Sequence, residues 1–260
     1  MKLFKILFIA LSTLFFIACG GENKKESIVV GATPVPHAEI LEFIKADLAN
    51  EGYELVIKEF NDYVLPNLST DSGEIDANFY QHIPYLDEFN KNNGTKLVNV
   101  AGIHLEPMAI YSAKHEEFKI SKNIKIAVPN DPTNESRALD IIAKTGAVSF
   151  NENALKTPKD IISNENNINF IELKPAQTPR SLADVDYAVI NANYALEAGL
   201  NPTKDGLVLE DKTSPYVNIL VVKEGKEKDK KTIALIKVLQ SQKVKEFIEQ
   251  KYNGAVIPAF

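Results

Sequence analysis

Apolar positions along the chain follow two kinds of pattern, which are short continuous runs and residues that recur every three or four positions. A β-branched run at 27–32 predicts a strand, and a turn with two prolines leads from it into a helix near 37–50. The apolar face of this helix consists of Ile40, Leu41, Ile44 and Leu48. A second run at 53–60 predicts another strand. A strand, a helix and a strand in this order favour a parallel sheet.

The same order of elements returns after residue 125, which suggests two similar α/β lobes. The further strands that we expect lie at 75–79, 96–100, 108–112, 125–128, 169–173, 187–190 and 216–222. The further helices that we expect begin near Pro66, Pro84, Glu135, Pro158 and Asn191, and a closing helix runs over 231–252. The strand at 108–112 would carry the chain into the second lobe.

The stretch AVPNDPTNESRALDII at 127–142 predicts a strand, a turn and a helix. Its turn would lie at the carboxyl end of a strand, where open α/β sheets bind ligands and a helix N-terminus offers free N–H groups to an anion. If Thr133 or Asn134 is the N-cap, Arg137 falls in the first turn, where the helix dipole disfavours a cation by about 0.3–1 kcal/mol. Either Asp140, three residues on, or a bound carboxylate would compensate.

The composition is that of a globular domain, and the first residues indicate that the protein is exported. The chain is 45% hydrophobic and 25% charged, which is ordinary for a globular domain. Residues 1–18 place two lysines before an apolar run that is too short to span a membrane, as in a signal peptide. Removing them changes the formal net charge from −6 to −8, which argues against nucleic acid as a partner.

The only cysteine, Cys19, follows this segment directly and resembles the lipidated residue of a bacterial lipobox. Residues 19–27 are polar and charged, as a tether between a lipid and a domain should be. We therefore expect a lipid anchor at Cys19. The protein would lie in the cell envelope, with its domain in the periplasm or otherwise outside the cytoplasmic membrane.

Five motifs resemble those of a known family. They are FNDYVLPN at 60–67, DANFYQHIPYL at 76–86, VPNDPTN at 128–134 with an arginine three residues later, LKPAQTPRSL at 173–182 and SPYVN at 214–218. Together they are similar to the methionine-binding lipoproteins, the NlpA/MetQ family of ABC-transporter substrate-binding proteins. The resemblance covers nearly the whole mature chain. It implies an α/β, two-lobed periplasmic-binding-protein-like (type II) fold, with the ligand cleft between the lobes.

The resemblance also implies how the chain is divided and which proteins it meets. Lobe 1 would comprise residues 28–110 plus 219–260, lobe 2 would comprise residues 111–218, and the strand at 216–222 would return the chain to lobe 1. The partners would be an ABC permease and its ATPase. We expect the protein itself to be a monomer that is anchored to the membrane through its lipid.

The cleft would receive polar and aromatic side chains from both lobes. The expected ligand-binding residues are Tyr63, Tyr80, His82, Tyr85, Asn134, Arg137, Asn191 and Asn218. They offer a fixed cation, amides and aromatic rings, which suits a zwitterion with an apolar side chain. Taken alone, Asn134 could be only an N-cap, and the tyrosines could be only core or rim residues.

By resemblance the ligand is L-methionine. Arg137 would bind its carboxylate, and the amide oxygens of Asn191 and Asn218 would bind its ammonium group. Asn134 would add a polar contact, the tyrosines would lie against the thioether, and His82 would close one wall. D-methionine, a methionine-containing dipeptide or another amino acid are the alternative ligands.

Other functional classes fit the sequence less well. A metal site would use His37, His82, His104 and His115 with Glu106, but these residues lack the spacing of a zinc motif, so we expect neither a metal nor a cofactor. His104 and Glu106 could instead approach the ligand. No nucleophile elbow, phosphate-binding glycine loop or general-base pair indicates an enzyme. A surface adhesin or other interaction lipoprotein is the third alternative.

Overall fold

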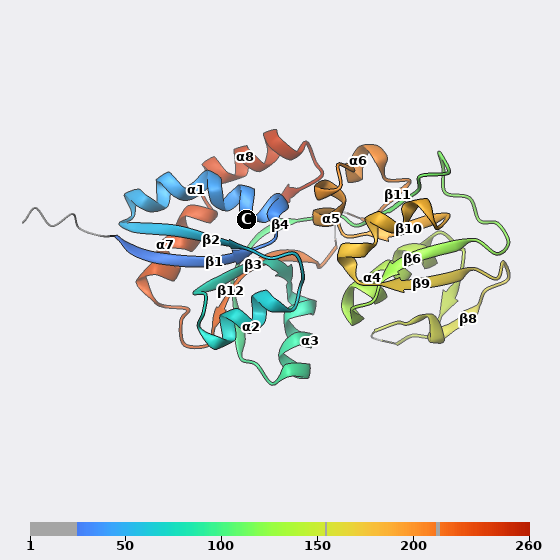
Figure 1. The fold of residues 1–260 in the computed structure, drawn as a ribbon, viewed down its shortest axis with the longest axis horizontal. Coiled ribbons are helices and arrows are strands. Elements are labelled where there is room, and N and C mark those ends of the chain that lie inside the picture. Colours follow the sequence, from blue (N-terminus) through green and yellow to red (C-terminus); the bar gives the residue numbers. More distant parts are fainter. Residues whose placement is uncertain (1–24, 154, 212–213) are drawn as a thin grey trace, which may run out of the picture.

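The protein is built around two β-sheets that lie end to end along its longest axis (Figure 1). The structure, a computed structural model, describes residues 25–153, 155–211 and 214–260. The expected signal peptide at 1–18, Cys19 and most of the expected tether lie outside the described residues. Within the described part of the chain, no helix is long and apolar enough to cross a membrane.

The first sheet has six strands in the order β13-β4-β12-β3-β1-β2. These strands are β1 (Glu26–Ala32), β2 (Tyr53–Glu59), β3 (Ala77–His82), β4 (Leu97–Leu105), β12 (Val217–Lys223) and β13 (Ile257–Pro258). β1 runs parallel to β2 and β3, whereas β12 runs antiparallel to β3 and β4. The carboxyl ends of the three parallel strands point toward the second sheet (Figure 1).

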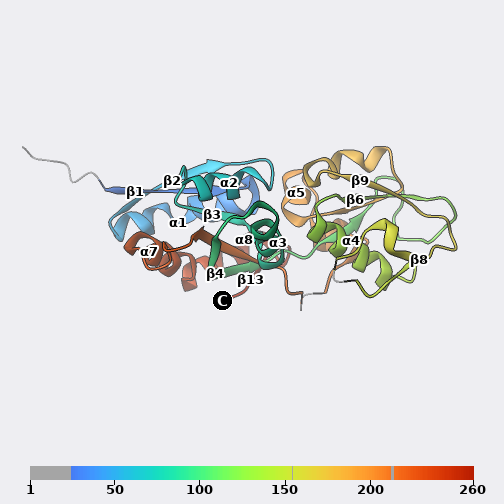
Figure 2. The same ribbon diagram turned by 90° about the horizontal axis from the view of Figure 1, so that it is seen from below.

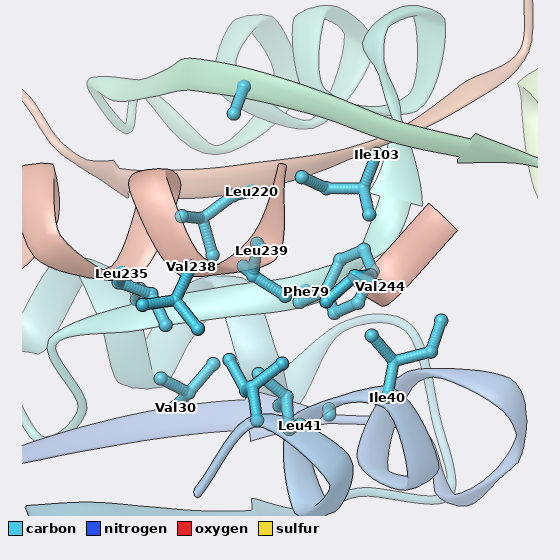
Figure 3. Close-up of a cluster of buried hydrophobic side chains, with 14 of the residues drawn as sticks. Val30, Ile40, Leu41, Phe79, Ile103, Leu220, Leu235, Val238, Leu239 and Val244 are labelled. Carbon is cyan, nitrogen blue, oxygen red and sulfur yellow. The ribbon is translucent and has the colours of Figure 1, made fainter. Parts of the chain in front are cut away.

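Helices cover both faces of the first sheet. They are α1 (Glu39–Asn50), α7 (Lys230–Leu239) and α8 (Gln242–Tyr252) on one face, and α2 (Leu65–Ser72) and α3 (Ile83–Asn93) on the other. Figure 3 shows the core beneath the first group, where Phe79 and Leu220 of the sheet meet Leu41 of α1 and Leu239 of α7. All four side chains are fully buried, and each such burial contributes about 1.5–3 kcal/mol.

The closing helix predicted over 231–252 is two helices. α7 ends at Leu239, and Ser241 is the N-cap of α8, where its Oγ accepts a hydrogen bond from the backbone N–H of Val244 at 3.4 Å. Serine favours this position because its hydroxyl satisfies a free N–H group of the first turn. The apolar periodicity continues across the break, so it did not reveal the break.

The second sheet has five strands in the order β11-β5-β10-β6-β9. These strands are β5 (Ala109–Tyr111), β6 (Lys125–Pro129), β9 (Asn169–Leu173), β10 (Tyr187–Ile190) and β11 (Val208–Leu209). The helices of this lobe are α4 (Pro132–Lys144), α5 (Ala192–Glu197) and α6 (Pro202–Asp205). A small hairpin joins β7 (Ser149–Phe150) to β8 (Ile161–Ser163), and the helix expected near Pro158 is a single 3₁₀ turn over Pro158–Asp160. The predicted two-lobed α/β fold is thus confirmed.

The described strands show that the chain passes from the first sheet to the second between β4 and β5 and returns between β11 and β12. β5 begins at Ala109 and pairs in the second sheet, and β12 begins at Val217 and pairs in the first. Strand membership therefore places the crossings at 106–108 and 210–216, two residues away from the expected boundaries at 110 and 218. At the junction α3 contacts α4 (Figure 2). α5 also contacts the turn Pro34–Ala38 there.

Candidate functional site

A small cleft with a volume of about 20 Å³ lies where the two lobes meet. It is lined by Tyr63, Tyr80, Gln81, His82, Tyr85, Glu106, Asn134, Arg137, Asn191, Ala192, Asn193 and Asn218. All eight sequence-predicted residues line this cleft. Tyr80 and His82 come from the end of β3, and Asn191 follows the end of β10, because the carboxyl ends of the parallel strands of both sheets face the junction.

Arg137 is buried and held side-on by Glu210. Its Nε donates to Oε1 of Glu210 at 2.8 Å, and its Nη2 donates to the other carboxylate oxygen and, at 2.8 Å, to the backbone oxygen of Glu106. The guanidinium also lies 4.3 Å from the ring centre of Tyr216. These contacts leave Nη1 without a hydrogen-bond partner among the described residues, so one edge of the guanidinium remains for a ligand.

Two local expectations about this helix are wrong. The N-cap is Asp131, not Thr133 or Asn134, and its Oδ1 accepts a hydrogen bond from the backbone N–H of Asn134 at 3.1 Å. Arg137 is therefore in the second turn, where the helix dipole disfavours a cation less. Asp140 does not neutralise Arg137, because it pairs with Lys156 at 2.9 Å.

Asn134 connects the two lobes through its side-chain oxygen. This oxygen accepts hydrogen bonds from Nδ2 of Asn191 at 2.8 Å and from Nε2 of His82 at 3.2 Å, while Nδ2 of Asn134 donates to Asp131 at 2.9 Å. Nδ1 of His82 accepts from the backbone N–H of Tyr85, which places the proton on Nε2. Oδ1 of Asn191 is buried and has no hydrogen-bond partner among the described residues.

His82 is uncharged in this setting. Burial and the nearby charge of Arg137 lower the pKa of His82 to about 3, although its bond to Asn134 acts in the opposite direction. The ring therefore closes one wall of the cleft as a neutral donor.

Three tyrosines form an aromatic wall in which the hydroxyl groups already have partners. Tyr80 and Tyr85 both donate to the backbone oxygen of Tyr63, at 2.7 and 2.8 Å. Tyr63 itself donates to Oδ1 of Asn193 in the second lobe at 2.5 Å. Its ring lies 5.8 Å from that of Tyr80 and 5.9 Å from that of Tyr85, between centroids. With their polar ends satisfied, the rings present apolar surface to the cleft.

Glu106 lines the cleft and contacts two buried histidines, His37 and His104. Its Oε1 is 2.6 Å from Nε2 of His104 and 3.2 Å from Nε2 of His37. Burial lowers the pKa of His37 to about 4 and that of His104 to about 3, so both rings are neutral at pH 7. Burial raises the pKa of Glu106, while its electrostatic interactions with a protonated His37 and with Arg137 oppose this rise.

These three residues are the described group whose donor atoms could meet at one ion, since the atoms lie within 4.8 Å of one another. They already bind each other, however, and a hydrogen-bonded carboxylate between two neutral rings accounts for the arrangement. The other two histidines of the expected metal set are elsewhere. His82 contacts Asn134, and the ring of His115 stacks on Tyr187 at 5.1 Å.

Several residues of the site were not selected from the sequence. Asn193 repeats the Asn-x pattern of Asn191 two positions later, and that repeat was a usable indication. Its Nδ2 is buried and, among the described residues, has no hydrogen-bond partner. Gln81 lies between two expected residues of β3. Glu210 has no local pattern, because its partner Arg137 is distant in the sequence.

Comparison with known proteins gives consistent results over the length of the chain. The model of the NlpA lipoprotein family matches residues 28–260. The methionine-binding lipoprotein MetQ of Bacillus subtilis is 40% identical over 253 residues, which span 93% of this chain and 92% of that protein. The D-methionine-binding lipoprotein MetQ of Escherichia coli is 37% identical over 98% of this chain and 97% of its own length.

Solved structures agree with this result. The structure of a nutrient binding protein from Burkholderia cenocepacia bound to methionine superposes with a TM-score of 0.88 and 40% sequence identity. The match covers 90% of this chain and all of that one. The fold and the sequence therefore point to the same group of proteins.

Proposed function

Since this chain belongs to the NlpA lipoprotein family, we propose that it is the substrate-binding lipoprotein of an ABC importer and that it captures L-methionine between its two lobes. The observation that carries the proposal is the composition of the cleft. A guanidinium edge, a carboxylate and a wall of three tyrosines line one small space. These groups match the carboxylate, the ammonium group and the apolar side chain of a free amino acid.

The charged ends of the ligand would be recognised by groups that have unused hydrogen-bonding capacity. Arg137 would donate from Nη1 to the carboxylate, and such charge-assisted bonds are about twice as strong as neutral ones. Glu106 and the unpartnered Oδ1 of Asn191 would accept from the ammonium group. A bound zwitterion would thus satisfy polar atoms whose burial is otherwise costly.

The thioether would lie against the aromatic wall. Sulfur near the edge of an aromatic ring gains about 0.3–1.5 kcal/mol per contact. Tyr63, Tyr80 and Tyr85 offer such edges, and His82 closes the same side of the cleft. Asn134 would act indirectly, because its oxygen already accepts two hydrogen bonds and holds Asn191 and His82 in place.

The surroundings of the protein follow from the same proposal. We infer that Cys19 carries a lipid that anchors the protein to a bacterial membrane, with the two lobes outside the cytoplasm. The loaded monomer would dock onto an ABC permease that is driven by its ATPase. Relatives named as binding proteins, together with a cleft that lacks a nucleophile and base pair among the described residues, support binding without catalysis.

Calorimetry on protein that has been unfolded, dialysed and refolded would test the ligand. The panel is L-methionine, D-methionine, glycyl-methionine and leucine, since one relative is named for D-methionine. We expect saturable binding, with L-methionine among the tight ligands. Tight binding of D-methionine or the dipeptide alone would transfer the proposal to that ligand, and turnover of a ligand would support an enzyme. Absence of all binding would favour an adhesin or interaction protein.

A further inference from the structure

The side chain of Asn218 has a defined orientation in the cleft. It lies near the start of β12, is 5% exposed and lines the cleft. Its Oδ1 faces Nε2 of His37 at 3.0 Å. Its Nδ2 has no hydrogen-bond partner among the described residues. The orientation of this amide decides whether the ligand meets a donor or an acceptor, so the group that fixes it determines specificity.

His37 carries its proton on the nitrogen that faces Asn218. Nε2 lies 3.0 Å from Oδ1 of Asn218 and 3.2 Å from Oε1 of Glu106, and both of these atoms are acceptors. Nδ1 lies 2.7 Å from Oγ1 of Thr33, whose hydroxyl can donate to it. If the Asn218 amide were reversed, its NH₂ would require an unprotonated Nε2, and that nitrogen would then face the Glu106 oxygen without a proton between them. The contact with Glu106 therefore selects one orientation of Asn218.

We propose that His37, held by Thr33 and Glu106, is a positioning residue that fixes the Asn218 amide so that its NH₂ group faces the cleft and donates to the carboxylate of the ligand. This role rests on the proposed capture of an amino acid. It reverses the polarity expected from the sequence, where the oxygen of Asn218 was assigned to the ammonium group.

The remaining unpartnered atoms of the cleft agree with this polarity. Nδ2 of Asn193 and Nη1 of Arg137 are further donors without partners in the described chain, and Asn218 would make a third. The acceptors are Oδ1 of Asn191 and the carboxylate of Glu106. Three donors for two carboxylate oxygens and two acceptors for one ammonium group match an α-amino acid at both ends.

Affinity measurements with matched ligands test the polarity of Asn218. The probes are L-methionine and 3-(methylthio)propylamine, which is methionine without its carboxylate. We expect Asn218→Ala to weaken binding of L-methionine about tenfold or more and to leave binding of the amine nearly unchanged. An equal loss for both ligands would overturn the proposal, because it would place Asn218 at the ammonium group or in a purely structural role.

A double-mutant cycle tests whether His37 acts through Asn218. We expect His37→Leu to weaken L-methionine binding and His37→Gln, which keeps a donor near the Nε2 position, to restore most of it. The double variant H37L/N218A should bind L-methionine no worse than N218A. His37 affects the affinity only through the Asn218 amide, and N218A has already removed that amide.

His104→Leu is the matched control, because His104 is equally buried and also contacts Glu106 but makes no bond to Asn218. Its loss should add to that of Asn218→Ala. Additivity for His37 as well would overturn the positioning role. If His37→Leu does not fold, the comparison of His37→Gln with its N218A double variant takes its place. Failure of the unmutated protein to bind L-methionine at all would instead refute the proposed function.

Discussion

Arg137 in α4 and Glu210, 73 residues later, form a buried pair in which Nε of the arginine donates to Oε1 of the glutamate at 2.8 Å. Oε2 of the same carboxylate also accepts from the backbone N–H of Met108 at 3.1 Å. The pair thus links α4 to both segments that pass between the lobes. It holds the guanidinium at the cleft, so Arg137 has a structural role as well as its proposed binding role.

Arg137→Ala should therefore reduce stability as well as affinity. The substitution leaves the buried carboxylate of Glu210 without its cation, and breaking a buried ion pair in this way costs about 3–5 kcal/mol. Urea denaturation of ligand-free protein would measure this loss. The double variant R137A/E210A should be less destabilised than the sum of the two single variants. Ligand-free R137A as stable as the unmutated protein would contradict the structural role.

Tyr63→Phe should loosen the contact between the lobes without changing the aromatic wall. It removes the hydroxyl that donates to Asn193 and leaves that buried amide oxygen unsatisfied. One neutral hydrogen bond contributes about 0.5–1.5 kcal/mol, so the Kd for L-methionine should rise about two- to tenfold, mainly through faster release. Stopped-flow displacement would measure the release rate.

Tyr194→Phe is the control for this change. The hydroxyl of Tyr194 also points to the opposite lobe, but it lies 3.4 Å from the backbone oxygen of Asn61 and makes a weaker bond. Its removal should change the release rate less than Tyr63→Phe does. An equal effect of the two variants would contradict a specific role for the bond between Tyr63 and Asn193.

Asp131→Ala should affect both helix stability and ligand binding. Loss of an N-cap costs about 0.5–2 kcal/mol, and Asp131 also holds Nδ2 of Asn134. Ser241→Ala removes the N-cap of α8, which lies away from the cleft, and should cost a similar amount of stability without changing affinity. Thermal unfolding and calorimetry on both variants would separate these effects. Equal affinities would contradict the role of Asp131 in orienting Asn134.

The sequence was sufficient for the elements that have local patterns. The run at 27–32 and the helix with Ile40, Leu41, Ile44 and Leu48 correspond to β1 and α1, because periodicity reports directly on which side of an element is buried. The expected site residues reach one cleft because the ends of parallel strands share one edge of a sheet. Family motifs identified which of those residues to select.

Other features depend on contacts that no local pattern reports. Glu210 is far from Arg137 in the sequence, so the nearby Asp140 was the partner that local spacing could offer. The tautomer of His37 depends on the neighbouring Thr33 and on Glu106 and Asn218. These residues belong to three segments of the chain that come together only after folding. The N-cap was recoverable, since Pro132 favours the first helical position and therefore Asp131 as the cap.

Three buried histidines should lower the stability of the ligand-free protein as the solution is acidified from about pH 6.5 to about pH 4. Burial lowers the pKa of His37 to about 4 and the pKa values of His82 and His104 to about 3, whereas an unfolded histidine has a pKa of about 6.5. In this window the unfolded state binds protons that the native state does not, so protonation favours unfolding. Three such groups contribute at most about 4 kcal/mol per pH unit.

The effect of pH on stability has the opposite sign for the buried carboxyl groups. Burial raises the pKa values of Glu106, Asp131 and Glu135, so the native state binds protons at these groups more readily than the unfolded state, and their contributions to stability grow on acidification. His104→Gln removes one histidine and should reduce the slope of stability against pH by about 1.4 kcal/mol per pH unit. Urea denaturation at several pH values between 6.5 and 4.5 would measure both slopes. Equal slopes for the variant and the unmutated protein would mean that His104 is charged in the folded state, and the hydrogen bonds that we assign around Glu106 would then have to be revised.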